Sequence, residues 1–356
     1  MRYVEITPGQ VTLREGPPAA LQPGDARVRV LACGVCGTDL EALRGMVLPR
    51  GVDYPLRPGH EIAGVVTEAG PALDGTGTTP PDTPAVGTPA AGEMVVLHPL
   101  APCGTCEACR RGEEQLCSDV RALGFHTPGG LAEEVVWPAA RMVPVRGLPP
   151  AQAALLADAV ATAFHALTYA EVPAGGVLCV LGAGGLGGQV IRLARVLHPD
   201  VTVVAVVRSQ ATADRVAQLG GVAIRGLEGA LRGVRDAVGR PDAVIDFTGD
   251  ETAAGVGLRL LRPGGRLVLG SVVDKPIDLG ISVTGITSRE IAVRGAYVST
   301  MDELRAVTEL ACAGRLDLGD AVSHVLPLER APEALEIVEA HPPGLQRLVI
   351  TPGRQA

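Results

Sequence analysis

Residues 178–196 read LCVLGAGGLGGQVIRLARV, a short apolar run followed by a glycine-rich turn and the start of a helix. Gly182, Gly184 and Gly187 form G-x-G-x-x-G directly after the expected strand, a context that makes the motif specific. The three glycines allow a tight turn, the approach of a pyrophosphate to the backbone, and close packing of helix on strand. Because the helix N-terminus faces the phosphate charge, the stretch predicts a dinucleotide site that includes Gly185 and Leu186. The alternative is a structural glycine-rich turn in an unrelated α/β protein.

The end of the next expected strand, VTVVAVVRSQ at residues 201–210, bears on the choice of dinucleotide. An acid about 20 residues past the last glycine normally binds the ribose 2′-hydroxyl of NAD. Here the strand ends in Val207, Arg208 and Ser209, without an acid. A guanidinium and a hydroxyl suit a 2′-phosphate better than a bare diol. The sequence therefore favours NADP over NAD, with NAD as the alternative if Arg208 is only a solvated surface charge.

The pattern of expected elements divides the chain of 356 residues at about Pro150. Before this point, runs such as ARVRVLACGVC and HEIAGVVTEAG are broken by Gly and Pro, which predicts an antiparallel β region with many loops. After it, the expected strands GVLCVLG, VTVVAVV, DAVIDFTG and GRLVLGS alternate with helices, as in a doubly wound parallel sheet. Helices are also expected at residues 151–170, 301–314 and 331–340. We therefore expect an α/β protein of two domains.

Composition and charge argue against several kinds of partner. Lys and Arg number 31 against 39 Asp and Glu, and the formal net charge of −8 has the wrong sign for binding phosphate backbones or anionic lipid. Aromatic residues make up 2% of the chain, so base-stacking platforms are not expected. We identify no signal-peptide pattern and no apolar run approaching the ~20 residues needed to cross a bilayer. A cytoplasmic chain without nucleic-acid or membrane partners is expected.

Four of the eight cysteines lie close together, at Cys103, Cys106, Cys109 and Cys117. The spacing C-x2-C-x2-C-x7-C lets four thiolates converge on one tetrahedral centre. A long chain without a signal peptide favours a metal over a disulfide framework. Free or paired cysteines and a small iron–sulfur cluster are the alternatives. Because a closed four-cysteine site has no position for substrate, the sequence predicts a structural zinc ion.

A second metal site is suggested by Cys36 in CGVCGTDL and His60 in PGHEIAG, both at expected strand-to-loop transitions. Each residue is a weak signal alone, since a single Cys is usually a small buried hydrophobe and a single His beside Gly is usually a hydrogen-bonded or surface residue. Their joint occurrence with the cysteine cluster and the dinucleotide motif favours a metal site.

Together these segments resemble the zinc-dependent medium-chain alcohol and polyol dehydrogenases over nearly the whole chain. The matching pieces, in the family's order, are CGVCGTDL, PGHEIAGVV, PCGTCEACRRGEEQLC, ADAVATAFHAL, GAGGLGG and RPGGRLVLG. The resemblance implies a GroES-like β-rich catalytic domain built from residues 1–157, with a structural zinc lobe at 98–120, and from residues 298–356. It places a Rossmann domain at 158–297 and implies a homodimer or homotetramer. With the two ligand sets, it implies two zinc ions per chain, one catalytic and one structural.

The resemblance makes Cys36 and His60 ligands of the catalytic zinc, and Glu61 the adjacent carboxylate that can approach the metal. The family takes its third protein ligand from the start of the helix that enters the Rossmann domain. That place falls on Asp158. The alternative for Asp158 is a carboxylate on the helix surface or in its first turn.

Further roles are implied in the same way. Thr38 would hydrogen-bond the substrate oxygen and pass on its proton, Asp39 would orient the zinc-bound histidine, and Arg347 would reach the cofactor pyrophosphate. Two departures from the family pattern concern the proton route. Gly37 replaces the phosphate-contacting histidine of some branches, and Glu41 stands where the proton relay often ends in histidine.

The expected reaction is the reversible oxidation of a primary or secondary alcohol or polyol to a ketone or aldehyde, with hydride passing to NADP or NAD. The rival interpretations are a zinc-free quinone or enoyl reductase of the same fold and a non-catalytic zinc-dependent binding protein. Pocket walls, with His98 and Leu100 expected among them, would select the small-molecule substrate. The Pro/Thr/Gly/Ala tract at residues 71–92 is expected to be a mobile surface loop.

Overall fold

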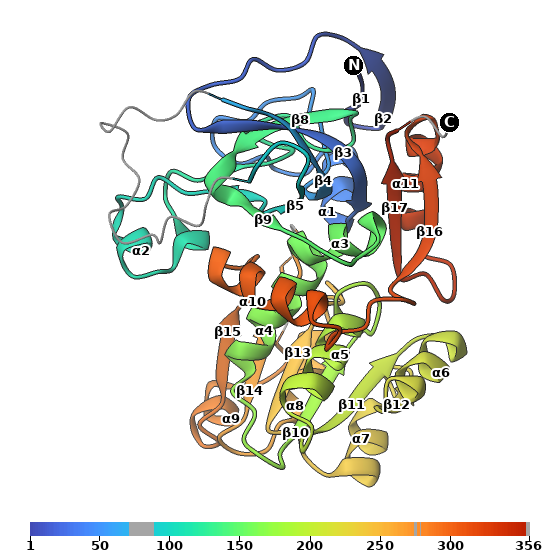
Figure 1. Cartoon of the computed structure of the whole chain (residues 1–356). Coiled ribbons are helices and arrows are strands. Elements are labelled where there is room, and N and C mark those ends of the chain that lie inside the picture. The colour runs from blue at the N-terminus through green and yellow to red at the C-terminus, as the bar shows by residue number, and fades with distance from the viewer. Residues whose placement is uncertain (71–88, 274–275, 278, 354–356) are drawn as a thin grey trace.

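The computed structural model of the chain describes residues 1–356 apart from 71–88, 274–275, 278 and 354–356 (Figure 1). A β-rich part, drawn at the top of Figure 1, lies above a part built on a parallel sheet. The chain returns to the β-rich part at its end, where β17 (Arg347–Thr351) pairs with β3 (Asp25–Val35). The two ends of the chain therefore share one sheet, as the GroES-like resemblance implies. Most of the loop expected at 71–92 lies outside the described residues.

The main sheet of the β-rich part has the strand order β16-β17-β3-β4-β5-β9, and β8 also pairs with β3. Neighbouring strands are antiparallel except β16 and β17. The remaining strands are β4 (Glu61–Ala69), β5 (Met94–Leu97), β8 (Glu134–Pro138), β9 (Met142–Pro144) and β16 (Val322–Pro327). Two small ribbons join β1 (Arg2–Thr7) to β2 (Gln10–Glu15) and β6 (Leu100–Ala101) to β7 (Arg121–Ala122). Short helices α1 (Gly37–Leu43) and α2 (Glu107–Arg110) follow β3 and β6, α11 (Ala331–Ala340) precedes β17, and single turns lie at Glu114–Leu116, Ala139–Arg141 and Leu328–Arg330.

The second sheet is entirely parallel, with the order β12-β11-β10-β13-β14-β15. Its strands are β10 (Val177–Leu181), β11 (Thr202–Val207), β12 (Val222–Arg225), β13 (Ala243–Asp246), β14 (Arg266–Leu269) and β15 (Ala292–Gly295). The chain runs outward from β10 in one direction and then, from β13, in the other. This reversal opens a crevice at the carboxyl ends of β10 and β13, where doubly wound sheets bind ligands. The predicted doubly wound fold is confirmed.

Alternate residues of the central strands point to opposite faces of this sheet, as strand geometry requires. Leu178 and Val180 pack with α4 (Ala161–Ala170), α5 (Gly187–Leu197) and α6 (Gln210–Gln218). Cys179 and Leu181 pack with α7 (Ala230–Val238) and α8 (Ala253–Leu260) on the other face. A short helix, α9 (Val283–Thr287), precedes the edge strand β15. Both cores consist mainly of Ala, Val and Leu, because the chain has few aromatic residues.

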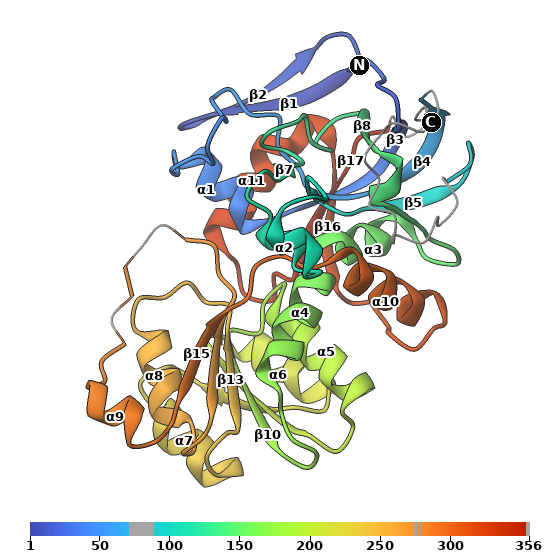
Figure 2. The same ribbon diagram turned by 90° about the vertical axis from the view of Figure 1, so that its left-hand side faces the viewer.

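One long helix connects the two parts. It comprises α3 (Pro150–Leu155), a π-helical turn at Leu156–Val160, and α4. After β15, helix α10 (Met301–Cys312) packs against α4 where the two parts meet (Figure 2). The residues between β15 and α10 therefore lie at the boundary between the parts.

Candidate active site

Cys36 and His60 come together because two antiparallel strands carry them to the same end of the sheet. β3 ends one residue before Cys36, β4 begins one residue after His60, and the strand register pairs Gly34 with Glu61. A Cβ on Gly34 would lie 2.0 Å from Glu61 Oε2, so only glycine leaves room for this carboxylate. One donor atom from each of Cys36, His60, Glu61 and Asp158 lies within 4.8 Å of the others, and all four residues are buried.

Asp158 reaches this cluster from the π-helical turn. π-bulges inside α-helices are frequent at functional sites, because the extra residue redirects a side chain. Asp158 Oδ2 lies 3.8 Å from Cys36 Sγ and 3.7 Å from His60 Nε2, while Thr162 Oγ1 donates a hydrogen bond to Oδ1 at 2.6 Å. The resemblance placed this carboxylate at the start of the helix that enters the Rossmann domain, and it lies in the π-helical turn that leads into α4. Asp158 lies inside a continuous helix and points into the cluster.

The donor set fits a zinc ion. Donors bound at ~2.0–2.3 Å around a tetrahedral zinc lie roughly 3.3–3.8 Å from one another, and the two separations from Asp158 Oδ2 match this spacing. The nitrogen-to-oxygen separation is too long for a hydrogen bond. Three carboxylates, of Asp39, Glu61 and Asp158, are buried here beside a single guanidinium, that of Arg347. Because unbalanced buried charge is unfavourable, this excess of negative charge suits a divalent cation.

Glu61 is held behind the cluster by Arg347. The guanidinium donates to both carboxylate oxygens of Glu61, and its Nη2 atom also lies 3.6 Å from Cys36 Sγ and 3.6 Å from Asp158 Oδ2. Burial raises the pKa of Glu61 to about 7, although Arg347 favours the ionised form. Burial acts in the same direction on Asp158, but the charges of His60 and Arg347 and the hydrogen bond from Thr162 outweigh it and lower the pKa of Asp158. Asp158 is therefore the stronger anion of the two.

Asp39 holds the two loops that carry the expected ligands. It accepts hydrogen bonds from the backbone N–H of Cys36 at 2.9 Å and of Gly59 at 3.3 Å. The expected orienting contact to the imidazole is longer, with Asp39 Oδ1 3.8 Å from His60 Nδ1. That nitrogen is buried and has no hydrogen-bond partner among the described residues. In this structure Asp39 thus holds the two loops through their backbones, and its carboxylate lies too far from the His60 ring for a hydrogen bond.

A cavity of about 450 Å³ opens beside the cluster. Cys36, His60 and Asp158 line it, together with Thr38 from α1 and Leu186 from the glycine-rich loop. Thr38 Oγ1 lies 3.7 Å from Cys36 Sγ, so the hydroxyl is next to the candidate metal donors. The lining also includes Gly37, Glu41, Leu100, Phe247, Thr248, Tyr297 and Val298.

Of the two polar residues Glu41 and His98, only Glu41 lines the cavity. Glu41, which stands at the end of the expected proton route, lines the cavity and accepts a hydrogen bond from Arg44 at 2.9 Å. His98 was expected in the pocket wall, and this is wrong. The His98 side chain is fully buried behind the wall, where its Nε2 atom lies 3.0 Å from the carbonyl oxygen of Ser299. Leu100 does line the cavity.

The glycine-rich loop has the geometry that the motif requires. Gly182 has φ +81°, and a Cβ on Gly187 would lie 1.8 Å from the carbonyl oxygen of Gly182. A Cβ on Gly184 would have no atom nearer than 3.8 Å, so this backbone is open to a ligand. A Cβ on Gly185 would lie 3.0 Å from Nη1 of Arg347. The guanidinium that binds Glu61 therefore also borders the loop expected to hold the pyrophosphate.

Arg208 and Ser209 differ in their availability to a cofactor. Ser209 is the N-cap of α6, and its Oγ accepts from the backbone N–H of Thr212 at 3.1 Å. Arg208 is exposed at the end of β11. His341 is the residue nearest to a Cβ built on Gly184. Partial burial, and then the charge of Arg208, lower the pKa of His341. Arg208 is thus close enough to this side of the loop to affect charge there.

The four cysteines of the second cluster lie with their sulfur atoms within 4.8 Å of one another. Backbone N–H groups point at them: Cys106 N donates to Cys103 Sγ at 3.4 Å, and Asp119 N donates to Cys117 Sγ at 3.4 Å. Backbone hydrogen bonds at Cys109 and Ser118 lower the pKa of Cys106 to about 6. Four convergent sulfurs, some stabilised as thiolates, fit a closed zinc site.

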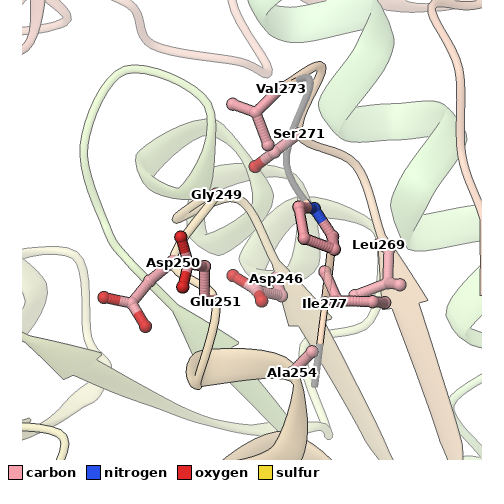
Figure 3. Close-up of a pocket in the computed structure, with 10 residues that line it drawn as sticks. Asp246, Gly249, Asp250, Glu251, Ala254, Leu269, Ser271, Val273 and Ile277 are labelled. Atoms are coloured by element: carbon pink, nitrogen blue, oxygen red, sulfur yellow. The ribbon is translucent and has the colours of Figure 1, made fainter. Parts of the chain in front are cut away.

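A smaller cavity, of about 100 Å³, lies beyond the carboxyl ends of β13 and β14 (Figure 3). Asp246, Asp250 and Glu251 line it, and it shares Ser271 and Val273 with the larger cavity. Its acidic lining disfavours phosphate groups. The negatively charged part of a dinucleotide is therefore better accommodated at the glycine-rich loop.

Comparison with known sequences identifies the family. The alcohol dehydrogenase GroES-like domain matches residues 22–147, and the zinc-binding dehydrogenase domain matches residues 185–312. The chain is 30% identical over 328 residues to the D-altritol 5-dehydrogenase of Agrobacterium fabrum, covering 91% of each chain. This chain belongs to the zinc-dependent medium-chain dehydrogenase family. It is an oxidoreductase of the alcohol dehydrogenase type, as the sequence predicted.

Solved structures of medium-chain dehydrogenases have the same fold. An alcohol dehydrogenase from Thermus sp. ATN1 superimposes with a TM-score of 0.85 at 28% identity, covering 99% of both chains. A putative zinc-binding dehydrogenase from Sinorhizobium meliloti, bound to NADP, superimposes with a TM-score of 0.84 at 26% identity, covering 99% of both chains. The predicted GroES-like and Rossmann architecture is confirmed.

Several features of this dehydrogenase were not expected from its sequence. Within the described residues, one helical segment, Pro150–Ala170, has the length and apolar composition of a membrane span, although no such run was expected. Of its apolar 18-residue stretch, 83% is buried inside the protein. Tyr297 and Val298 line the cavity although no motif marks them. The Arg347–Glu61 pair joins two strands distant in sequence. The only sequence feature that pointed to this ion pair was the basic residue Arg347 in the last strand.

Proposed function

We propose that this medium-chain dehydrogenase transfers a hydride reversibly between NADP or NAD and a primary or secondary alcohol or a polyol, with a ketone or aldehyde as the oxidised product. The observation that carries the proposal is the shared cavity, onto which both the metal donors and Leu186 of the glycine-rich loop open. Its volume of about 450 Å³ is typical of small-molecule sites. A zinc-free quinone or enoyl reductase would have no use for the buried donors. A non-catalytic binding protein would need no dinucleotide loop beside them.

Cys36, His60 and Asp158 would hold the catalytic zinc, and all three side chains line the cavity in which substrate would bind. When bound there, zinc lowers the pKa of a coordinated alcohol and so favours the alkoxide from which hydride leaves. Glu61, kept close by Arg347, adds negative charge behind the metal donors and can approach them. Asp39 keeps the loops of Cys36 and His60 in place.

Thr38 would hydrogen-bond the substrate oxygen and pass on its proton, accepting it while releasing its own hydroxyl proton towards Glu41, because its hydroxyl lies in the cavity next to Cys36. Glu41, on α1 five residues after Cys36, lines the same cavity and is the group available to pass the proton towards solvent. Gly37 leaves this route open, since a Cβ there would meet no atom within 4 Å. Closing the cavity around both reactants would exclude water and align the hydride with its acceptor.

The dinucleotide would place its pyrophosphate at Gly182, Gly184 and Gly187, with Arg347 reaching it beside Gly185. We favour NADP, because no acid follows β11 and Arg208 is exposed at its end. The Ser209 oxygen already accepts a hydrogen bond as the N-cap of α6. Its hydroxyl would contribute by donating its proton to the 2′-phosphate. The related S. meliloti protein is bound to NADP, which is consistent with this preference.

The proposed metal content is two zinc ions per chain. Cys103, Cys106, Cys109 and Cys117 would hold the second one, in a structural role, because all four positions of a tetrahedral ion are then filled. The lobe at residues 98–120 would owe its folded state to this ion, since it contains only short elements.

We also propose a homodimer or homotetramer located in the cytoplasm. The edge strand β15 supports self-association: all four of its residues are exposed, and Val293 on it is 41% exposed. An uncovered edge strand is a template for pairing with another chain. We retain residues 1–157 with 298–356 as the catalytic domain and 158–297 as the cofactor domain.

The reaction is tested by incubating the purified, zinc-loaded protein with alcohols, polyols and the corresponding carbonyl compounds, each with NADP(H) and NAD(H), while following the absorbance of the reduced nicotinamide. Polyols come first, because the A. fabrum relative is a D-altritol 5-dehydrogenase. Turnover that disappears on replacing Cys36 by Ala but persists in Cys312→Ala, an exposed cysteine, supports the proposal. Absence of nicotinamide binding by titration would favour the non-catalytic binding protein.

A further inference from the structure

The segment that joins β15 to α10 forms one wall of the cavity and has a strained backbone. Tyr297 and Val298 line the cavity next to the metal donors. Val298 has φ +51°, a left-handed conformation that β-branched residues rarely adopt. Such a conformation persists only where the surrounding structure fixes it. The contacts that hold residues 299–301 therefore determine the shape of this wall.

His98 holds the segment at Ser299. The backbone N–H of Leu100 and the guanidinium of Arg141 both point at His98 Nδ1, at 3.2 Å and 3.0 Å. Because both are donors, Nδ1 must be the acceptor and Nε2 carries the proton. Nε2 then donates to the carbonyl oxygen of Ser299 at 3.0 Å. Arg141 thus selects the tautomer of His98 that binds the segment.

Glu114, from the four-cysteine lobe, holds the same segment two residues later, at Met301. Its carboxylate accepts two hydrogen bonds from Arg141, at 2.8 Å and 3.0 Å, and one from the backbone N–H of Met301 at 2.6 Å. Arg141 is also fixed by the carbonyl oxygen of Leu100 at 2.8 Å. Glu114 therefore anchors Met301 directly and, through Arg141 and His98, anchors Ser299.

The end of the segment next to α10 is held by contacts that do not involve Glu114. Thr300 and Glu303 form a capping box at the start of α10, and Glu303 also binds His165 of α4 at 2.9 Å. Loss of the Glu114 contacts would leave α10 attached to α4. Any change would be concentrated in residues 297–301, that is, in the cavity wall.

We propose that Glu114 is a positioning residue that links the four-cysteine lobe to the cavity: by anchoring Ser299 and Met301 it imposes the left-handed conformation of Val298 and sets the wall that contacts substrate and cofactor. The kinetic part of this inference rests on the proposed function. The conformational part does not. The lobe would then contribute to ligand affinity as well as to stability.

The test replaces Glu114 by Gln, which keeps the shape but removes the charge and one acceptor for Arg141 or Met301. Glu113→Gln is the matched control, because this neighbouring carboxylate pairs only with the exposed Arg111 among the contacts described. We expect faster amide hydrogen exchange at residues 298–301 in Glu114→Gln alone. We also expect KM for the alcohol and Kd for the reduced cofactor to rise about three- to tenfold, with kcat within about twofold.

Val298→Gly provides a second measurement, because glycine adopts φ +51° without strain. If Glu114 acts through this residue, Glu114→Gln should raise KM and Kd less in the Val298→Gly background than in the wild type. If Glu114→Gln alone does not fold, Glu114→Asp carries the same exchange comparison, because the shorter side chain keeps its charge but cannot reach both Arg141 and Met301. Zinc content must stay the same in all variants.

The inference is overturned if Glu114→Gln and Glu113→Gln have the same exchange rates at residues 298–301. It is also overturned if kcat falls while KM and Kd do not change, because Glu114 would then not shape the ligand-contacting wall. A wild-type protein that oxidises no alcohol and binds no nicotinamide counts against the proposed function. The exchange comparison would still decide the role of Glu114 in that case.

Discussion

The guanidinium of Arg347 and the carboxylate of Glu61 form a buried ion pair between residues 286 positions apart in the chain. The pair forms because β17 lies beside β3 and β3 lies beside β4. On one side the guanidinium contacts the metal donors Cys36 and Asp158, and on the other it borders Gly185 of the cofactor loop. One side chain thus connects the two halves of the proposed active site.

The first prediction concerns this pair. Arg347→Met should lower the free energy of unfolding by about 3–5 kcal/mol, because it leaves the Glu61 carboxylate buried without its partner. It should also weaken cofactor binding, since the cation beside Gly185 is lost. Urea unfolding and fluorescence titration with the reduced cofactor measure the two effects.

The double variant Arg347→Met, Glu61→Gln separates the effect on stability from the effect on cofactor binding. Removing both charges should restore part of the lost stability, whereas cofactor affinity should remain weak. If the double variant recovered cofactor affinity as well, Arg347 would serve only to neutralise Glu61 and would not contact the pyrophosphate.

The second prediction concerns the catalytic metal. Asp158→Asn keeps the size of the side chain but replaces a zinc-binding carboxylate by a weak amide ligand. Elemental analysis should show zinc falling from about two ions per chain to about one, with loss of turnover and retention of the four-cysteine zinc. Thr162→Val is the control, because it removes the hydrogen bond to Asp158 Oδ1 and leaves the carboxylate in place. Full zinc and wild-type turnover in Asp158→Asn would mean that another residue is the third ligand.

The sequence predicted those features that depend on local pattern. The motif Gly182-x-Gly184-x-x-Gly187 predicts its own turn because the required backbone geometry is set by three neighbouring glycines. The spacing from Cys103 to Cys117 predicts convergence because the loops between the sulfurs are short. Cys36 and His60 needed the family resemblance, since only the β3–β4 register brings them together.

Features that depend on long-range packing could not be predicted. The π turn that directs Asp158 into the cluster has no local sequence signal, because apolar periodicity alone describes an ordinary helix at 151–170. His98 was expected in the pocket wall, whereas packing places it behind the wall against Ser299. The left-handed Val298 is set by contacts from residues far away in the chain.

The third prediction concerns the four-cysteine lobe. Cys106→Ser should reduce zinc by about one ion per chain and lower the thermal unfolding temperature, because structural zinc binding is coupled to folding. Cys312→Ser, at an exposed cysteine outside both clusters, should change neither. Elemental analysis and calorimetry make the comparison. A Cys106→Ser variant with unchanged zinc content and unfolding temperature would contradict a metal role for the cluster.

The fourth prediction concerns acid stability. Burial, and then the charge of Arg141, lower the pKa of His98 from 6.5 to about 3. Below about pH 6.5 the unfolded chain therefore takes up a proton that the folded protein does not bind. Between pH 6.5 and about 3, this difference should reduce the free energy of unfolding by up to ~1.4 kcal/mol per pH unit.

The measurement is the pH dependence of urea unfolding between pH 4.5 and 7 for wild type and His98→Gln, whose amide can still donate to Ser299 but does not titrate. The variant should lose less stability as the pH falls. His324→Gln, at a partly exposed position on β16 where the ring contacts the hydroxyl of Ser323, should behave as wild type. Equal slopes for all three proteins would show that His98 is protonated in the folded state.

The fifth prediction concerns the choice of cofactor at Arg208. An acid at this strand end would repel a 2′-phosphate and accept hydrogen bonds from a ribose diol, so its absence removes an obstacle to NADP and a main contact for NAD. A charge-assisted hydrogen bond from Arg208 to the 2′-phosphate would add roughly 1.5–3 kcal/mol, or about a tenfold to hundredfold preference for NADP.

Arg208→Ala should therefore lower kcat/KM for NADP by about tenfold to hundredfold and leave the value for NAD nearly unchanged. Arg232→Ala, whose side chain is 92% exposed on α7, should change neither. A structural readout accompanies the kinetics: because Arg208 lowers the pKa of His341, the variant should raise that pKa, which NMR titration of the histidine detects without turnover. A rise in the pKa of His341 together with an unchanged NADP to NAD ratio would place Arg208 near the loop but outside the 2′-phosphate site. A wild-type preference for NAD that Arg208→Ala does not alter would contradict the NADP proposal and leave the dehydrogenase assignment intact.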